Sequence, residues 1–112
     1  MKKKIIIVTG GCGFVGSNLI EFLLKKTNLK ILSLDDYSSG TKKNHIKNKR
    51  VKYLKGHTKN ISIQLNRYKN QIHSLFHFGE FSRIYQSFKF MNKCIQSNTI
   101  GSNAVFDFCL KN

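Results

Sequence analysis

The segment Lys4-Ile-Ile-Ile-Val-Thr-Gly-Gly-Cys-Gly-Phe-Val-Gly16 decides the fold. A continuous apolar run ends in a loop with glycines at positions 10, 11, 13 and 16, and a helical pattern follows at once. This order predicts a buried strand, a tight turn and a helix start, which is the geometry that binds a dinucleotide pyrophosphate. Glycine serves three purposes there: a sharp turn, close approach of the backbone to the phosphates, and close packing of the helix on the strand.

An acidic residue follows the glycine loop at the spacing that a dinucleotide site requires. Residues 30–34 form a second apolar run that ends on Asp35. An acid about 20 residues after the loop accepts the ribose hydroxyls of the cofactor. A carboxylate there also repels a 2′-phosphate, so we expect NAD and not NADP as the cofactor. The alternative is that Asp35 is an ordinary acidic turn residue.

The rest of the chain alternates between strand and helix patterns. We expect strands at 5–9, 30–34, 51–54 and 72–78, a helix at 14–26, a polar loop at 37–50, a weak helix at 59–68 and one long helix at 83–110. This order predicts an α/β protein with a partial Rossmann-type, doubly wound parallel sheet of about four strands in the order 3-2-1-4, with flanking helices. In the long helix Gly101 indicates close packing, and Asn98 is either a structural hydrogen-bonding residue or a cofactor contact.

The length and composition limit the class of protein. The 112 residues are 40% hydrophobic and suit one domain. No apolar run approaches the roughly 20 residues of a membrane span, and the run after Met1 to Lys4 is too short for a signal peptide. The three cysteines have no CxxC spacing, which predicts reduced thiols and a cytoplasmic protein. We interpret Cys12, within the glycine loop, as a small neutral residue; the alternative is a reactive thiol near the helix N-terminus.

The formal net charge of +15 suggests nucleic-acid binding as another function. The lysines, however, are spread along the chain among Asn and Ile, and the chain has only three Arg. A nucleic-acid interface gathers Arg and Lys on one face or along one helix. We therefore do not expect nucleic-acid binding as the main function, and we expect no membrane partner, although a basic chain does attract phosphate-rich small ligands.

Four motifs together resemble one family. Residues 9–16 (TGGCGFVG) are similar to the TGGxGFxG opening of the NAD-dependent sugar-nucleotide epimerases and dehydratases, which are extended short-chain dehydrogenases/reductases. Residues 34–40 (LDDYSSG) resemble the D-N-L-S-x-G segment, residues 76–80 (FHFGE) resemble H-x-A-G, and residues 98–102 (NTIGS) resemble N-x-x-G-T. The chain is thus identified as a member of this family, as its N-terminal part. The resemblance implies one NAD-binding domain over residues 1–112, without the catalytic and substrate-binding C-terminal part.

The resemblance also implies roles for individual residues. The glycine loop and the start of the first helix would contact the pyrophosphate, and Asp35 would hold the adenosine ribose. Residues 36–40 would line the adenine side, residues 57–58 would flank the adenine, and residues 78–82 would pass beside the nicotinamide. Asn98 would support the loop and the cofactor across the sheet. The candidate cofactor-binding residues are Gly10, Gly13, Phe14, Val15, Gly16, Asp35, Asp36, Tyr37, Ser38, Ser39, Gly40, His57, Thr58, Phe78, Gly79, Glu80, Ser82 and Asn98.

Three positions depart from the family pattern. The family usually has Asp where His57 stands, as the acceptor for the adenine amino group, and Asn where Asp36 stands. We expect neutral His57 to accept one hydrogen bond in place of that Asp. Glu80 replaces a small residue, which indicates a subgroup with its own substrate contacts.

The catalytic residues of this family are expected beyond position 112. The family uses a Ser or Thr on the fifth strand and a Tyr-x-x-x-Lys pair on the next helix. Residues 85–89 (YQSFK) match the second pattern, but they follow the fourth strand directly, and a Lys-rich chain produces such matches by chance. We interpret Tyr85 and Lys89 as surface residues and predict neither a catalytic residue nor a metal site in this chain.

The sequence leaves three functions to compare. The first is the NAD-binding portion of a sugar-nucleotide epimerase or dehydratase, in which NAD takes a hydride from a nucleotide sugar and usually returns it; the complete enzyme is expected to be a homodimer. The second is a non-catalytic dinucleotide-binding sensor or regulatory module. The third is a basic nucleic-acid binder, which predicts salt-sensitive binding. In all three, the fourth strand is expected to be an exposed apolar edge that favours association.

Overall fold

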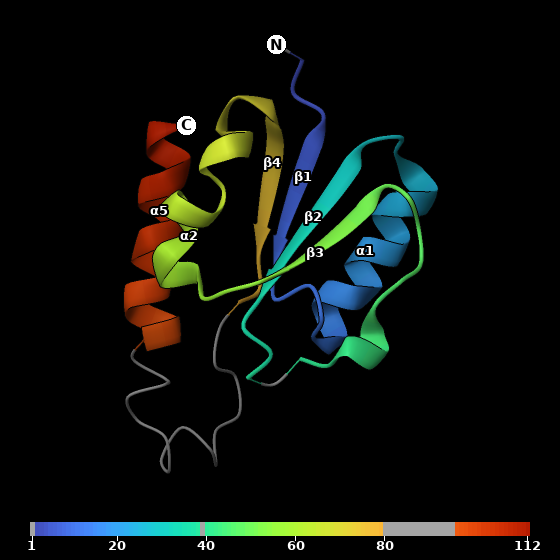
Figure 1. The fold of residues 1–112 in the computed structure, drawn as a ribbon, viewed down its shortest axis with the longest axis horizontal. Helices are drawn as coiled ribbons and strands as arrows, with labels where there is room; N and C mark the ends of the chain where they lie inside the picture. The colour runs from blue at the N-terminus through green and yellow to red at the C-terminus, as the bar shows by residue number, and fades with distance from the viewer. Residues whose placement is uncertain (1, 39, 80–95) are drawn as a thin grey trace.

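The fold is built on a four-stranded parallel sheet. The structure, a computed structural model, describes residues 2–38, 40–79 and 96–112. The strands are β1 (Ile5–Thr9), β2 (Lys30–Asp35), β3 (Val51–Lys55) and β4 (Ile72–His77). They pair in the order β3-β2-β1-β4, and every pair is parallel (Figure 1). The predicted partial Rossmann-type sheet with the order 3-2-1-4 is confirmed.

Helices cover both faces of the sheet. Helix α1 (Phe14–Lys26) lies on one side, and α2 (Ile61–Gln64) and α5 (Ser102–Lys111) lie on the other (Figure 1). Successive strand residues point to opposite faces, so the unbroken apolar run of β1 is buried on both sides. One cluster contains Ile5, Ile7, Val105 and Phe108, and the other contains Ile6, Val8, Ile20 and Leu23.

Helix α1 has the bounds that the sequence pattern predicts. Its last turn is closed by Thr27, whose backbone N–H donates to the Leu23 carbonyl at 2.9 Å. The Arg50 guanidinium then donates to the carbonyls of Leu24, Thr27 and Leu29 at 2.5, 2.8 and 3.0 Å. A cation at this end of a helix satisfies open carbonyl groups and opposes the negative end of the helix dipole.

The other predicted helices differ from the observed ones. The expected helix at 59–68 is divided into a 3₁₀ turn (Thr58–Asn60), α2 and a second 3₁₀ segment (Asn66–Gln71). The divisions fall at Asn60 and Leu65, whose φ/ψ values of −107°/18° and −104°/8° lie outside the α region. Of the expected helix at 83–110, residues 83–95 lie outside the described residues; Gln96–Gly101 form a π-helical turn, and α5 follows. No helix among the described residues is long and apolar enough to cross a membrane.

Candidate functional site

The glycine loop lies at the carboxyl ends of β1 and β2. The Gly10 N–H donates to the Leu34 carbonyl at 2.8 Å, so the loop begins as a continuation of the β1–β2 pairing. Gly10 has a φ of +71°, and a Cβ at this position would collide with the Phe78 carbonyl oxygen. A residue with a side chain does not fit this conformation at low energy. Gly10 therefore makes the sharp turn that the sequence predicts.

The two later glycines have different surroundings. A Cβ on Gly16 would collide with the Gly10 carbonyl oxygen, so Gly16 allows α1 to pack against the loop. A Cβ on Gly13 would meet only that same oxygen, at 3.4 Å, which leaves the space in front of the helix start open. Gly13 is the N-cap of α1, no side chain caps it, and the first turn holds no acidic residue. The positive end of the helix dipole is thus accessible to an anion.

The peptide groups of Cys12 join the glycine loop to two later segments. The Cys12 N–H donates to Asp35 Oδ2 at 3.0 Å. The Cys12 carbonyl accepts from the Thr41 N–H at 3.2 Å and from Asn44 Nδ2 at 2.7 Å. The side chain of Cys12 is fully buried, and this burial raises the pKa of the thiol. Cys12 therefore supplies backbone groups that fix the loop, and its thiol stays protonated at neutral pH.

Asp35 ends β2 and is almost fully buried at the base of the glycine loop. Its Oδ1 accepts from the Tyr37 N–H at 2.8 Å, while its Oδ2 holds the loop through Cys12. Tyr37 has a φ of +62°, and its phenol lies 2.7 Å from Nε2 of His45. Burial raises the pKa of the Tyr37 phenol. Each carboxylate oxygen has two lone pairs, so Asp35 holds the turn and keeps acceptor capacity for a ribose.

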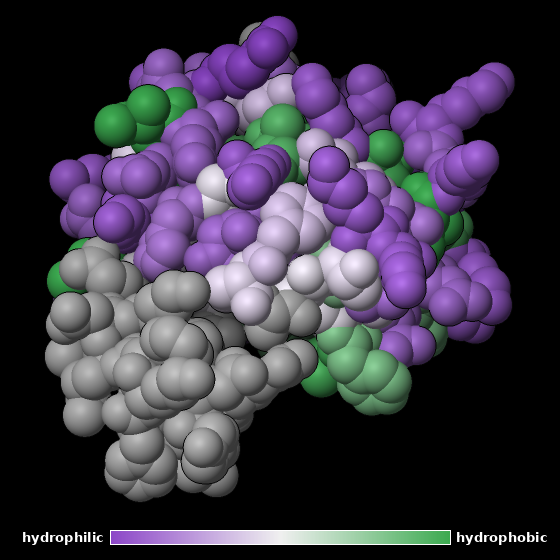
Figure 2. All heavy atoms as spheres, turned by 60° about the horizontal axis from the view of Figure 1, so that its bottom comes forward, coloured by the Kyte–Doolittle hydropathy of each residue, from purple (hydrophilic) through white to green (hydrophobic). Residues whose placement is uncertain are grey.

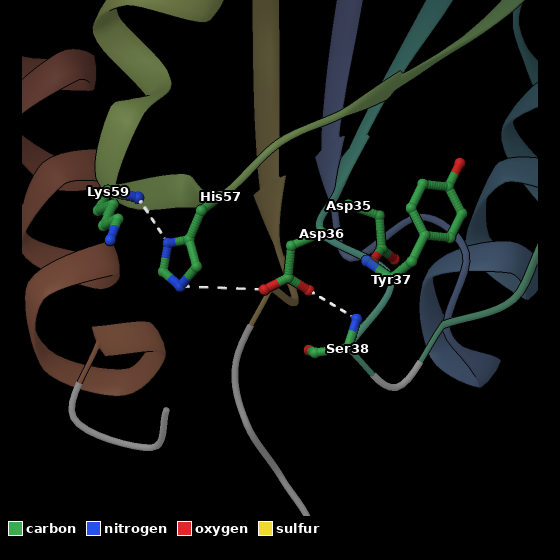
Figure 3. Close-up of polar contacts among 6 residues, drawn as sticks. All are labelled: Asp35, Asp36, Tyr37, Ser38, His57 and Lys59. Atoms are coloured by element: carbon green, nitrogen blue, oxygen red, sulfur yellow. Dashed lines mark hydrogen bonds and ion pairs between the residues drawn. The ribbon is translucent and has the colours of Figure 1, made fainter. Parts of the chain in front are cut away.

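Asp36 and His57 face each other across the ends of β2 and β3 (Figure 3). His57 Nε2 lies 3.9 Å from Asp36 Oδ2, and Asp36 Oδ1 accepts from the Ser38 N–H at 2.9 Å. His57 Nδ1 accepts from the Lys59 N–H at 3.1 Å. The structure therefore differs from the expectation that neutral His57 offers an acceptor to adenine, since the nitrogen that can accept is already bonded to the backbone.

A chain of side-chain hydrogen bonds lies on the β4 side of the loop. Thr9 Oγ1 accepts from the N–H groups of Phe78 and Gly79, both at 3.0 Å, and lies 2.6 Å from His77 Nδ1. The Thr9 hydroxyl proton is thus directed to Nδ1, and the one ring proton of neutral His77 then lies on Nε2. Nε2 lies 3.0 Å from Ser102 Oγ at the start of α5. This chain fixes where the backbone turns away after β4.

The described candidate residues gather at the carboxyl end of the sheet. In Figure 2, which brings this end of the molecule forward, a band of weakly polar residues lies beside strongly hydrophilic side chains. Thr58, at the start of the turn after β3, is buried, and its Oγ1 has no hydrogen-bond partner within the described residues. Asn98 lies in the π-helical turn and is half-buried. Ser39, Glu80, Ser82, Tyr85 and Lys89 lie outside the described residues.

Sequence reasoning missed the residues that support the site from a distance. Thr41 and Asn44 lie in a segment whose sequence predicts only a polar loop, and the link from Thr9 through His77 to Ser102 joins opposite ends of the chain. A T-x-x-N pattern at a 3₁₀ turn (Lys42–Asn44) is the local sequence signal that could have identified Thr41 and Asn44. Within residues 2–38, 40–79 and 96–112, no group of three His, Cys, Asp or Glu side chains is placed to hold a metal ion.

Comparison with known proteins identifies relatives for nearly the whole chain. Residues 6–112 match the model of the NAD dependent epimerase/dehydratase family. A dTDP-D-glucose 4,6-dehydratase of Dictyostelium discoideum is 32% identical over 110 residues, covering 93% of this chain and 25% of that protein. A UDP-glucuronic acid decarboxylase of Arabidopsis thaliana is 41% identical over 39 residues, covering 35% of this chain and 11% of its own.

Solved structures share the fold. An epimerase from Methanothermobacter thermautotrophicus superposes with a TM-score of 0.84 and 26% identity, over 96% of this chain and 32% of that one. The Bordetella bronchiseptica enzyme WbmF, solved in complex with NAD⁺, has a TM-score of 0.86 and 21% identity, over 96% of this chain and 32% of its own. The chain thus spans a quarter of the dehydratase and about a third of these two structures.

Proposed function

The chain belongs to the NAD-dependent epimerase/dehydratase family, and on this premise we propose that it is the NAD-binding portion of a sugar-nucleotide epimerase or dehydratase. Its own residues would hold the cofactor, and bound NAD supplies a hydride acceptor for a sugar carbon. The nucleotide-sugar substrate, the homodimer and the cytoplasmic location belong to the same proposal for the whole enzyme.

The observation that carries the proposal is the preformed phosphate loop. Its backbone is fixed through Cys12 by Asp35 and Asn44, and the start of α1 lies open in front of Gly13. A pyrophosphate fits this arrangement because it needs free N–H groups and close approach of the backbone. Asp35 lies where a ribose hydroxyl would donate, and its negative charge opposes the 2′-phosphate of NADP.

Calorimetric titration of the chain with NAD and with NADP tests the proposal. We expect saturable binding of NAD and at least about tenfold weaker binding of NADP, a difference of about 1.4 kcal/mol. Asp35→Asn should reduce this preference, whereas Asp107→Asn, which removes a charge from an exposed position of α5, should leave it unchanged. Absence of saturable NAD binding would overturn the proposal. Affinity for generic DNA that increases with the length of the DNA and disappears at high salt would favour the nucleic-acid alternative.

Catalysis by this chain alone is not expected. Epimerase or dehydratase turnover of a nucleotide sugar by the 112-residue chain would contradict this part of the proposal. A non-catalytic dinucleotide-binding module is the second candidate, because the described residues that fit a cofactor include no Tyr-x-x-x-Lys pair. Sequencing the transcript downstream of residue 112 separates the two. An in-frame continuation with the catalytic pair supports the enzyme, and a stop codon followed by an unrelated gene supports the module.

A further inference from the structure

We propose that Asp36, oriented by the Ser38 N–H and faced by His57, accepts the hydrogen bond from the 6-amino group of the cofactor's adenine. This inference rests on the proposed NAD binding and concerns which residue recognises the base. It assigns the acceptor to Asp36, at the end of β2, and gives His57, which follows β3, the role of a positioning residue.

The position of Asp36 follows from the strand order. The ribose acceptor Asp35 ends β2, and β3 is the next strand on the side away from β1. A base attached to a ribose at Asp35, with its pyrophosphate at the start of α1, extends across the end of β2 toward β3. Asp36 and His57 are the polar side chains that face each other there (Figure 3). The side chain of Asp36 is 30% exposed, so it is accessible from this end of the sheet.

The carboxylate of Asp36 is oriented by two contacts. Its Oδ1 accepts from the Ser38 N–H at 2.9 Å, which fixes the side chain over its own turn. Its Oδ2 faces His57 Nε2 at 3.9 Å, beyond the range of a direct hydrogen bond. Because a carboxylate offers about four lone-pair sites, these contacts leave acceptor capacity on an oriented group. An exocyclic amino group, which only donates, is the complementary ligand group.

His57 does not accept this hydrogen bond itself, because its acceptor nitrogen already has a backbone partner. Its Nδ1 accepts from the Lys59 N–H, so the proton of the neutral ring lies on Nε2, directed toward Asp36. Burial lowers the pKa of His57, which keeps the ring neutral near pH 7. The neutral ring thus faces Asp36 with an N–H dipole, which favours this orientation of the carboxylate without neutralising it.

Nicotinamide hypoxanthine dinucleotide is the probe that tests this assignment. It has a carbonyl oxygen in place of the 6-amino group and a proton on N1, so the group at position 6 becomes an acceptor that faces the Asp36 carboxylate. We expect the unmodified chain to bind NAD about tenfold or more tightly than this analogue, because a hydrogen bond to a charged group is replaced by repulsion. The ratio of the two dissociation constants, measured by calorimetry, is the readout.

Two variants locate the source of the preference. Asp36→Asn keeps its one oxygen for the Ser38 N–H and therefore turns its NH₂ group to the base, so the ratio should fall to within about threefold of one or reverse. His57→Ala should weaken NAD binding and change the affinity for the analogue little, so the ratio of the two dissociation constants should fall partway. Asp107→Asn is the charge-matched control and should keep the full ratio. If Asp36→Asn lowers the melting temperature, Asp36→Ser, which also retains an acceptor for the turn, replaces it.

The outcomes separate this inference from the proposed function. NAD binding with equal affinity for the analogue would overturn the role of Asp36 and leave NAD binding intact. A full preference retained in both Asp36 variants would also overturn it and point to another acceptor, such as a backbone carbonyl. Failure of the unmodified chain to bind either dinucleotide would overturn the proposed function and this inference with it.

Discussion

The two halves of the site are held by different kinds of hydrogen bond. On the β2 side, backbone groups of Cys12 bond to Asp35, Thr41 and Asn44, all within the first part of the chain. On the β4 side, the side chains of Thr9, His77 and Ser102 form the connection, and they come from distant parts of the sequence. The first half fixes the main chain of the glycine loop, where we propose that a pyrophosphate binds. The second half fixes the direction in which the chain leaves the sheet.

The two edges of the sheet show a related difference. Edge strand β3 carries Lys52 and Lys55, both exposed, and such charges discourage pairing with another chain. Edge strand β4, residues 72–77 (IHSLFH), contains no Lys, Arg, Asp or Glu, and most of its residues are only half-buried. No strand among the described residues pairs with its outer edge. Of the two sheet edges in the described part of the chain, the β4 edge is therefore the less protected.

The largest effect is expected where the glycine loop packs on α1. Gly16→Ala places a Cβ against the Gly10 carbonyl, so we expect a loss of about 1–3 kcal/mol in the free energy of unfolding and roughly 100-fold weaker NAD binding. Thermal melts measure the stability, and calorimetry measures the affinity for NAD. Gly13→Ala is the matched control, because its Cβ points into open space. It should cost under about 1 kcal/mol of stability yet weaken NAD binding. Equal melting temperatures for both variants would contradict this account of packing.

The bond from Asn44 to the glycine loop is expected to have the next largest effect. Asn44→Ala removes the 2.7 Å hydrogen bond to the Cys12 carbonyl, so the loop loses one of its two ties from this segment. NAD affinity should fall about tenfold, or about 1.4 kcal/mol. The control is Asn48→Ala, since Asn48 lies in the same loop and its side chain accepts from the Arg50 N–H at 2.9 Å. The same loss of affinity in both variants would show that Asn44 has no special role.

The exposed edge of β4 predicts concentration-dependent association. His73 is exposed on this strand, so His73→Lys adds a charge without entering the core and should weaken association roughly fivefold. Sedimentation velocity over a range of concentrations measures this. Ser62→Lys adds the same charge at an exposed position of α2 and should have less effect. A chain that stays monomeric at every concentration would refute the prediction.

The smallest expected effect is a pH dependence from His57. Burial lowers the pKa of His57 in the folded chain below the ordinary value of 6.5. The charge of Lys59 lowers it further, and the charge of Asp36 raises it by less than burial lowers it. The unfolded chain then binds more protons as the pH falls through 6.5, so folding stability decreases there by under about 1 kcal/mol. Urea melts at several pH values should show this slope, and His57→Gln should flatten it. A steeper slope in the variant would contradict the direction assigned to this pKa.

The sequence predicts the β2 side of the molecule well because its determinants are local. The bounds of α1 agree with the expected helix at 14–26, since a glycine loop precedes it and an apolar repeat defines its face. The parallel order follows from alternating strands and helices. Asp35 lies at the base of the loop as its spacing predicts, and its ribose role stays a prediction. Its hydrogen bond to the Cys12 N–H is not predicted, because one residue type at one distance does not reveal which atoms it contacts.

The β4 side is predicted less well because its determinants are long-range. The link between Thr9 and Ser102 leaves no local pattern, and the π-helical turn at Gln96–Gly101 was expected to be regular α-helix. The role of His57 was also predicted incompletely. Its residue type allows an acceptor, but the Lys59 N–H occupies that nitrogen. Such a contact depends on the turn after β3 and is visible only in the folded chain.

An NMR titration of the uniformly labelled 112-residue chain with NAD tests the central claim most directly. The amide signals of Gly13, Phe14 and Val15 should shift saturably with those of residues 35–38 and 57–58, in physiological salt, while those of the exposed end of α5 near Lys111 stay unchanged. Shifts confined to lysine-rich segments and abolished by salt, or no saturable shifts at all, would contradict the claim that this loop is a preformed NAD site.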